Sequence, residues 1–136
     1  MVPRGIRNNN PLNIRKGNNW KGERHPQTDP AFEEFETMVM GIRAGFKLLR
    51  NYITGYNGKV KPINTIHKIV HRWAPMTENA TDRYIDFVSK DAGIDPHAVI
   101  RYEDRKSMVA IVDAMIFVEC GQRVSRDVIQ SAYDLV

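Results

Sequence analysis

The sequence lacks several features that would assign it to a common class of protein. A single cysteine, Cys120, among 136 residues excludes an internal disulfide and a cysteine metal cluster. No apolar run is long enough to span a bilayer, so no membrane partner is expected. The first residues, MVPRGIRNNN, have no apolar core of a secretory signal. Any action outside the cytoplasm would therefore require another route of export.

Motifs for cofactors and metals are also missing. The chain has no glycine-rich phosphate loop and no nucleophile elbow. His67 and His71 are four residues apart in the string HKIVH, but the glutamate of the zinc motif HExxH is absent. We therefore expect no cofactor and no metal site.

The net charge is modest and positive. There are 20 Lys and Arg against 16 Asp and Glu, giving a net charge of +4. The early part of the chain carries most of this surplus, in Arg4, Arg7, Arg15, Lys16, Lys21 and Arg24. Such a surplus is compatible with a polyanionic partner such as nucleic acid or cell wall. Its small size favours a solvated basic surface, so no nucleic-acid partner is predicted.

The length of 136 residues predicts a single domain with two regions. Residues 1–36 lack helical periodicity and are punctuated by glycine and proline. Short extended pieces fit at residues 12–15, 20–22 and 32–36, which predicts a small β-hairpin region. Residues 37–136 show apolar spacings of three and four, which predict helices. These cover about 38–56, 65–73, 79–92 and 103–120, with a short piece near 95 and a last helix after Ser125.

The predicted fold class is thus α+β, mainly α, with an N-terminal β-hairpin region followed by five or six helices. Thr37, Asn64 and Ser125 are the expected helix caps.

Glu119 is the first candidate for catalysis. It falls four residues beyond Met115, on the apolar stripe of a helix that contains almost no other polar residue. Burial at the edge of a core would raise its pKa, as a general acid working near neutral pH requires. A glutamate at a helix end can equally form an ordinary structural ion pair, for example with Arg123.

The string FEEFE at residues 32–36 supplies further carboxylates. In an extended strand Glu34 and Glu36 would share one face. A strand carboxylate opposite a helix carboxylate would resemble the pair of a glycosidase. The alternative is a solvated edge strand whose glutamates balance nearby arginines. Glu36 is our second candidate acid, and Glu78 the third.

Aromatic and amide side chains between Trp73 and Tyr84 suit a carbohydrate groove, because aromatic rings stack on sugar faces. Trp73, Asn79 and Tyr84 are therefore candidate substrate-binding residues. The alternative is structural: Trp73 fills the core, and Thr77 or Asn79 caps the next helix.

A family resemblance connects these features. The strings concerned are RGIRNNNPLNIR (4–15), WKG (20–22), GIRA (41–44), RWAP (72–75) and the spaced residues Glu78-Asn79, Thr81 and Tyr84-Ile85. The series resembles a family of short phage and prophage proteins, called structural or virion proteins, over about residues 4–95. The chain begins just before the first motif, as members of that family do, and is expected to be complete. It departs from the family pattern at Leu12, where glycine is common.

The segment NNPLNIR with the following WKG is in turn similar to the β-hairpin of peptidoglycan glucosaminidases and, more distantly, of lysozyme-like transglycosylases. The resemblance implies a lysozyme-like fold in which Asn10, Asn13 and Arg15 line a glycan groove. In those enzymes the catalytic glutamate precedes the hairpin, whereas only eight residues precede the NNPLNIR segment here. A permuted arrangement, with Glu119 in the catalytic position, would restore the acid.

Two functions follow from this resemblance. The first is a phage- or prophage-encoded enzyme that cleaves the glycan strands of peptidoglycan as a hydrolase or lytic transglycosylase. The second is a non-catalytic virion protein that binds wall glycan or another virion protein. In both cases the protein would be made in the bacterial cytoplasm and act in a virion or at the cell wall.

Overall fold

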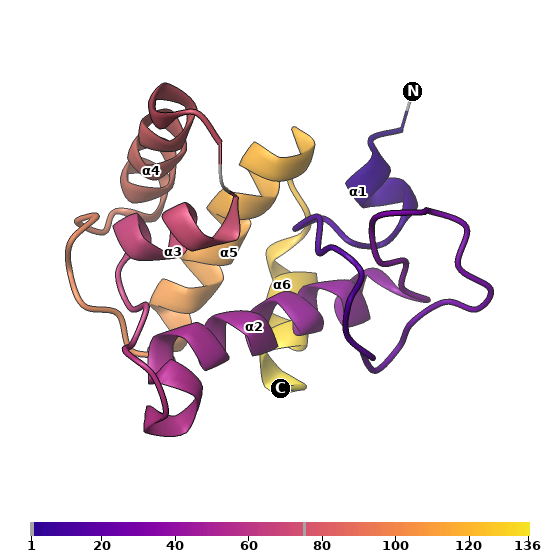
Figure 1. The fold of residues 1–136 in the computed structure, drawn as a ribbon. Coiled ribbons are helices and arrows are strands. Elements are labelled where there is room, and N and C mark those ends of the chain that lie inside the picture. The colour runs from indigo at the N-terminus through magenta and orange to yellow at the C-terminus, as the bar shows by residue number, and fades with distance from the viewer. Residues whose placement is uncertain (1, 75) are drawn as a thin grey trace. The chain divides into compact units, whose positions relative to one another are not determined.

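The computed structural model describes residues 2–74 and 76–136 (Figure 1). Pro75 of the RWAP string lies outside them. Over the described residues the chain is helical, with no β-sheet. The helices are α1 (Arg4–Arg7), α2 (Met38–Gly58), α3 (Ile66–Trp73), α4 (Glu78–Ala92), α5 (Arg105–Cys120) and α6 (Arg126–Asp134). The prediction of an α+β, lysozyme-like fold is therefore wrong.

The predicted N-terminal β-hairpin is the specific error. Between α1 and α2 the chain follows an irregular path, drawn without a strand in Figure 1. Extended pairing is limited to two isolated antiparallel bridges, Arg15 with Phe32 and Glu23 with Phe35. A hairpin needs a continuous ladder of backbone hydrogen bonds. Here side-chain amides and carboxylates bond many of the backbone groups that such a ladder would use.

Asn10 bonds buried backbone groups in place of such a ladder. Its side chain is 1% exposed. The Nδ2 group donates to the carbonyls of Ile14 at 2.9 Å and Glu33 at 3.0 Å, and Oδ1 accepts from the Ile14 amide at 3.0 Å. One side chain thus satisfies three backbone groups on two segments, which replaces part of a ladder.

Asn8 and Asn9 bind the same returning segment. Asn8 Nδ2 donates to Asp29 Oδ2 at 3.0 Å, and Asp29 Oδ1 accepts from the backbone amides of Ala31 and Phe32. The Ala31 and Phe32 amides, and then Asn8, lower the pKa of Asp29 to about 2. Asn9 adopts a left-handed conformation, with φ of 52°, and donates to the Phe35 carbonyl at 3.1 Å. Asparagine tolerates this conformation better than most residues.

Two glycines one turn apart on α2 receive the N-terminal segment. A Cβ atom on Gly41 would lie 1.7 Å from the backbone oxygen of Asn9, and one on Gly45 would lie 2.3 Å from Leu12 Cδ1. Because neither residue has a Cβ, Leu12 can lie fully buried against the helix. The first glycine of the GIRA string is therefore required for the N-terminal segment to pack against α2.

Helix boundaries follow the capping residues of the sequence. Thr37 Oγ1 accepts from the Met40 amide at 3.2 Å and Ser125 Oγ from the Asp127 amide at 3.2 Å, as predicted. The cap of α3 is Thr65, which accepts from Lys68, and not Asn64. The predicted short helix near Asp95 is a turn. The four-residue helix α1 was not predicted.

The chain divides into two compact units. The first unit comprises Met1–Lys47 with Met115–Val136, and the second comprises Leu48–Ala114. Fully buried residues of the first unit include Leu12, Phe35, Phe46 and Ile129. In the second unit α3 packs against α4, and the buried residues include Ile66, Ile69, Val70 and Val88. That all 136 residues form one domain stays a prediction.

We expect Gly41→Ala to destabilise the protein far more than Gly45→Ala. The Gly41 variant places a methyl group on a backbone oxygen, which cannot move without shifting the loop, at a cost of about 3 kcal/mol or more. At Gly45 the contact is the tip of Leu12, and alanine gains about 1 kcal/mol of helix propensity. Urea unfolding of both variants measures the difference, and equal stability would contradict this packing.

We expect Asn10→Ala to lower the free energy of unfolding by roughly 2–4 kcal/mol, because it removes three buried hydrogen bonds and leaves the Ile14 amide and the Glu33 carbonyl without this partner. Asn18→Ala is the control, since Asn18 is exposed and should change stability by less than about 0.5 kcal/mol. Thermal unfolding of the two variants checks this, and a mild effect at Asn10 would count against its role.

Candidate functional site

Glu119 and Asn13 are brought together in the first unit. Glu119 lies in the last turn of α5 and is half-buried. Asn13 follows the buried Leu12 and has a left-handed φ of 54°. Its Nδ2 group donates to Glu119 Oε1 at 3.0 Å and to the Glu119 carbonyl at 3.2 Å. An amide and a carboxylate separated by 106 positions therefore meet at one helix end.

The same contact has a local structural role. The last carbonyls of a helix have no partner within the helix, and Asn13 satisfies that of Glu119. Gly121 then leaves the helix with a left-handed φ of 72°. Next to the pair, a Cβ on Gly5 of α1 would lie 3.3 Å from Cys120 Cβ, so α1 and the end of α5 approach closely. Burial raises the pKa of the Cys120 thiol, which keeps it protonated.

The other predicted residues of the first unit have different surroundings. Asn10 is buried within the loop and serves its structure. Arg15 is exposed, with its guanidinium carbon 4.6 Å from the centre of the Phe32 ring, and the guanidinium carbon of Arg4 lies 3.6 Å from the same centre. Glu36 is exposed and lies two residues before the start of α2.

Four predicted residues belong to the second unit. Trp73 ends α3 and lies edge-on to Tyr52, with ring centres 6.1 Å apart. Tyr84 is buried in α4. Glu78 and Asn79 are exposed in the first turn of α4, after the cap Thr77. Their predicted roles in catalysis and binding stay predictions.

Glu34 does not share a face with Glu36, contrary to the strand prediction. Glu34 is 3% exposed. Its carboxylate accepts hydrogen bonds from the backbone amides of Thr28 and Asp29 and lies 3.5 Å from Arg24. These partners outweigh burial and hold the pKa of Glu34 below its usual value. Glu34 is a structural anion of the loop, and Arg24 is one of the nearby arginines expected to balance a glutamate.

Glu33 is the residue that sequence reasoning missed. It is 3% exposed, and its Oε2 atom has no hydrogen-bond partner among the described residues. It lines a hollow of about 360 Å³ in the first unit, whose other lining residues are Lys16, Gly17, Asn18, Asn19, Glu23 and Gln27. We name this hollow the Glu33 pocket.

Burial and the neighbouring Glu23 together raise the pKa of Glu33 to about 7, although the charge of Lys16 opposes the shift. Removal of solvent is the largest cause, followed by a hydrogen bond with Glu23 and by the charge of Glu23. At neutral pH the Glu33 carboxyl group is therefore partly protonated. The string FEEFE contains the residue, but alternation alone gave no sign that Glu33 would be enclosed.

The histidines of the HKIVH string form part of a cluster in the second unit. The ring centres of His67 and His71 are 4.6 Å apart, and those of His67 and His97 are 4.8 Å apart. Burial, then the two other histidines, lowers the pKa of His67. Among the described residues, no group of three or more His, Cys, Asp and Glu is arranged to hold a metal ion.

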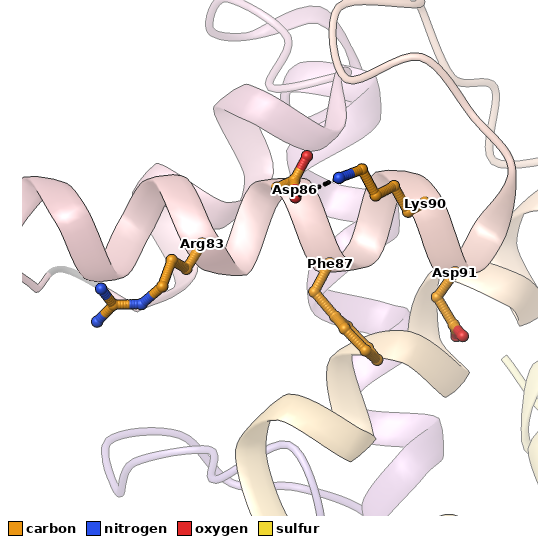
Figure 2. Close-up of a pocket in the computed structure, with 5 residues that line it drawn as sticks. All are labelled: Arg83, Asp86, Phe87, Lys90 and Asp91. Carbon is orange, nitrogen blue, oxygen red and sulfur yellow. Dashed lines mark ion pairs between the residues drawn. The ribbon is translucent and has the colours of Figure 1, made fainter.

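A second hollow, of about 540 Å³, lies along α4 and is lined by five residues of that helix (Figure 2). Asp86 and Lys90 form an ion pair across one helical turn at 2.9 Å, with side chains 62% and 77% exposed. An exposed pair of this kind contributes little energy. The polar residues that line this hollow are all exposed. The candidate sites are therefore those of the first unit.

The sequence of this chain is similar to that of a known phage protein. The chain is 43% identical over 122 residues to protein P5 of Pseudoalteromonas phage PM2, which covers 87% of this chain and 71% of that protein. The chain therefore belongs to the family of protein P5, which supports the predicted phage or prophage origin. No family model matches the sequence. The particular motif assignments and the similarity to glucosaminidases stay predictions.

None of the helices in residues 2–74 and 76–136 has both the length and the apolar character needed to cross a membrane.

The raised pKa of Glu33 predicts a specific pH dependence of stability. A carboxyl group whose pKa is about 7 in the folded state and 4.5 ordinarily binds its proton more tightly when folded. Its favourable contribution is complete below pH 4.5 and is lost as the pH rises to 7 and beyond. We expect Glu33→Gln to remove this loss, so that the variant gains stability relative to the wild type across this range. Urea unfolding at several pH values measures the difference, and a constant difference would contradict it.

Proposed function

We propose that this protein cleaves the glycan strands of peptidoglycan, with Glu119 as the general acid. The observation that carries the proposal is the contact between Asn13 and Glu119, two residues 106 positions apart. Membership of a phage protein family supports it, because a phage must pass its host's cell wall. The proposal does not require a lysozyme-like fold.

In the proposed mechanism the two oxygen atoms of the Glu119 carboxyl group have different roles. Glu119 Oε1 accepts from the Asn13 amide, so a proton on the carboxyl group would be carried by Oε2. Oε2 would donate this proton to the glycosidic oxygen as the bond from that oxygen to the anomeric carbon breaks. Water, or a hydroxyl of the sugar itself, would then bond to the anomeric carbon and release a proton. That last step would leave Glu119 protonated again.

Asn13 would position Glu119 and hold its carboxyl group in one orientation. Arg15 is exposed on the same segment and could bind polar groups of a glycan, whereas Asn10 would act only by fixing the loop. Glu36 and Glu78 are exposed, so neither carboxyl group is enclosed by the protein. They are therefore weaker candidates for the acid than Glu119.

A non-catalytic virion protein that binds wall glycan or another virion protein is the second candidate. The relation to protein P5 of a phage supports it as well as it supports an enzyme. The Asn13 contact favours the enzyme, because capping a helix would need only the carbonyl of Glu119 and not its carboxylate.

We expect Glu119→Gln to lower the clearing of purified peptidoglycan by at least 100-fold, because the amide cannot supply the proton. Stability should stay within about 0.5 kcal/mol of the wild type, since the Gln oxygen can still accept from Asn13. A zymogram with soluble fragment release measures the activity, and urea unfolding measures the stability.

Glu36→Gln and Glu78→Gln are the matched controls, because both glutamates are exposed. They should retain activity. Full activity of the Glu119 variant would refute its role as the acid. Binding of peptidoglycan by the wild type without release of fragments would favour the non-catalytic virion protein.

A further inference from the structure

The Glu33 pocket contains a buried carboxylate oxygen to which neither the fold nor the proposed function assigns a role. Glu33 Oε2 is enclosed, lacks a partner and lines a hollow of about 360 Å³, which is within the size range of ligand sites. An unsatisfied buried carboxylate oxygen costs free energy. Such an atom indicates that a partner from outside the chain completes the site.

The backbone around Glu33 is held firmly. Its amide donates to the Ile14 carbonyl at 3.0 Å, and its carbonyl accepts from Asn10 at 3.0 Å. On the other side of the pair, Glu23 Oε1 accepts from the backbone amide of Trp20 at 3.1 Å. The two carboxyl groups are therefore positioned before any ligand arrives, which reduces the cost of binding.

The charge of the pocket selects the kind of ligand. With both glutamates ionised, Glu23, Glu33 and Lys16 sum to one negative charge. A single positive charge would neutralise the pocket and take the place of a proton on Glu33. A primary ammonium group also has three N–H donors, matching the two carboxylates and the amide oxygens of Asn18 or Asn19.

We infer that the Glu33 pocket binds a protonated primary amine, such as that of an amino sugar or of an amine-bearing peptide side chain. A divalent cation fits less well, because Lys16 lines the pocket and only two carboxylates are present. The inference does not depend on the action of Glu119, so either proposal can fail without the other.

Titration with ethylammonium chloride, followed by NMR of the full chain, tests the inference. Ethanol is the matched neutral probe of similar size. Ethylammonium, but not ethanol, should cause saturable shifts in residues 16–33 and lower the pKa of the Glu33 carboxyl group. Because an alkylamine stays charged to about pH 10, affinity should rise between pH 6 and 8 as Glu33 loses its proton.

Glu33→Gln should weaken ethylammonium binding at least tenfold at pH 8, whereas Glu36→Gln, on the same segment but exposed, should leave it unchanged. Two further probes distinguish the natural source of the amine. Binding of glucosamine but not of N-acetylglucosamine would indicate an amino sugar, and binding of Nα-acetyl-lysine amide would indicate a peptide amine. Equal shifts from ethylammonium and ethanol, undiminished binding by the Glu33 variant, or saturable binding of Ca²⁺ with none of ethylammonium would each overturn the inference.

Discussion

Between α1 and α2 the backbone must satisfy its hydrogen-bonding groups without a sheet, and the organisation of the first unit depends on how it does so. Three consecutive asparagines meet much of this need. Asn8 reaches Asp29, Asn9 reaches the Phe35 carbonyl, and Asn10 joins the Ile14 and Glu33 backbones. These side chains bind the two ends of the segment together. The glycines of α2 then allow the bound segment to lie directly on the helix.

Both candidate sites of the first unit follow from this arrangement. Once Asn10 has fixed the turn and Leu12 is buried, Asn13 is left at the end of α5, where it meets Glu119. The bond from Asn10 to the Glu33 carbonyl likewise fixes the backbone from which the Glu33 carboxyl group enters its pocket. Residues that look like turn formers in the sequence therefore determine where two carboxyl groups lie. Asn13 holds the Glu119 carboxyl group itself, and Asn10 holds the backbone that carries the Glu33 carboxyl group.

Sequence patterns predicted the helical part of the fold well, because its signals are local. Apolar spacing and the caps Thr37 and Ser125 give the helices to within a few residues. The first 36 residues failed because short extended pieces between glycines and prolines look like strands whether or not they pair. The placement of Glu119 at a helix end was predictable from periodicity. The enclosure of Glu33 was not, because it depends on contacts with residues 14–27 that no local pattern contains.

The proposed function depends on the contact between Asn13 and Glu119, and a double-mutant cycle measures the strength of that contact. Urea unfolding of Asn13→Ala, Glu119→Ala and the double variant gives the coupling free energy of the two side chains. The cycle cancels the cost of placing alanine at a left-handed φ and the bond to the Glu119 carbonyl. A hydrogen bond between the two side chains predicts a coupling of about 1 kcal/mol or more. Additive effects, within about 0.5 kcal/mol, would contradict the account.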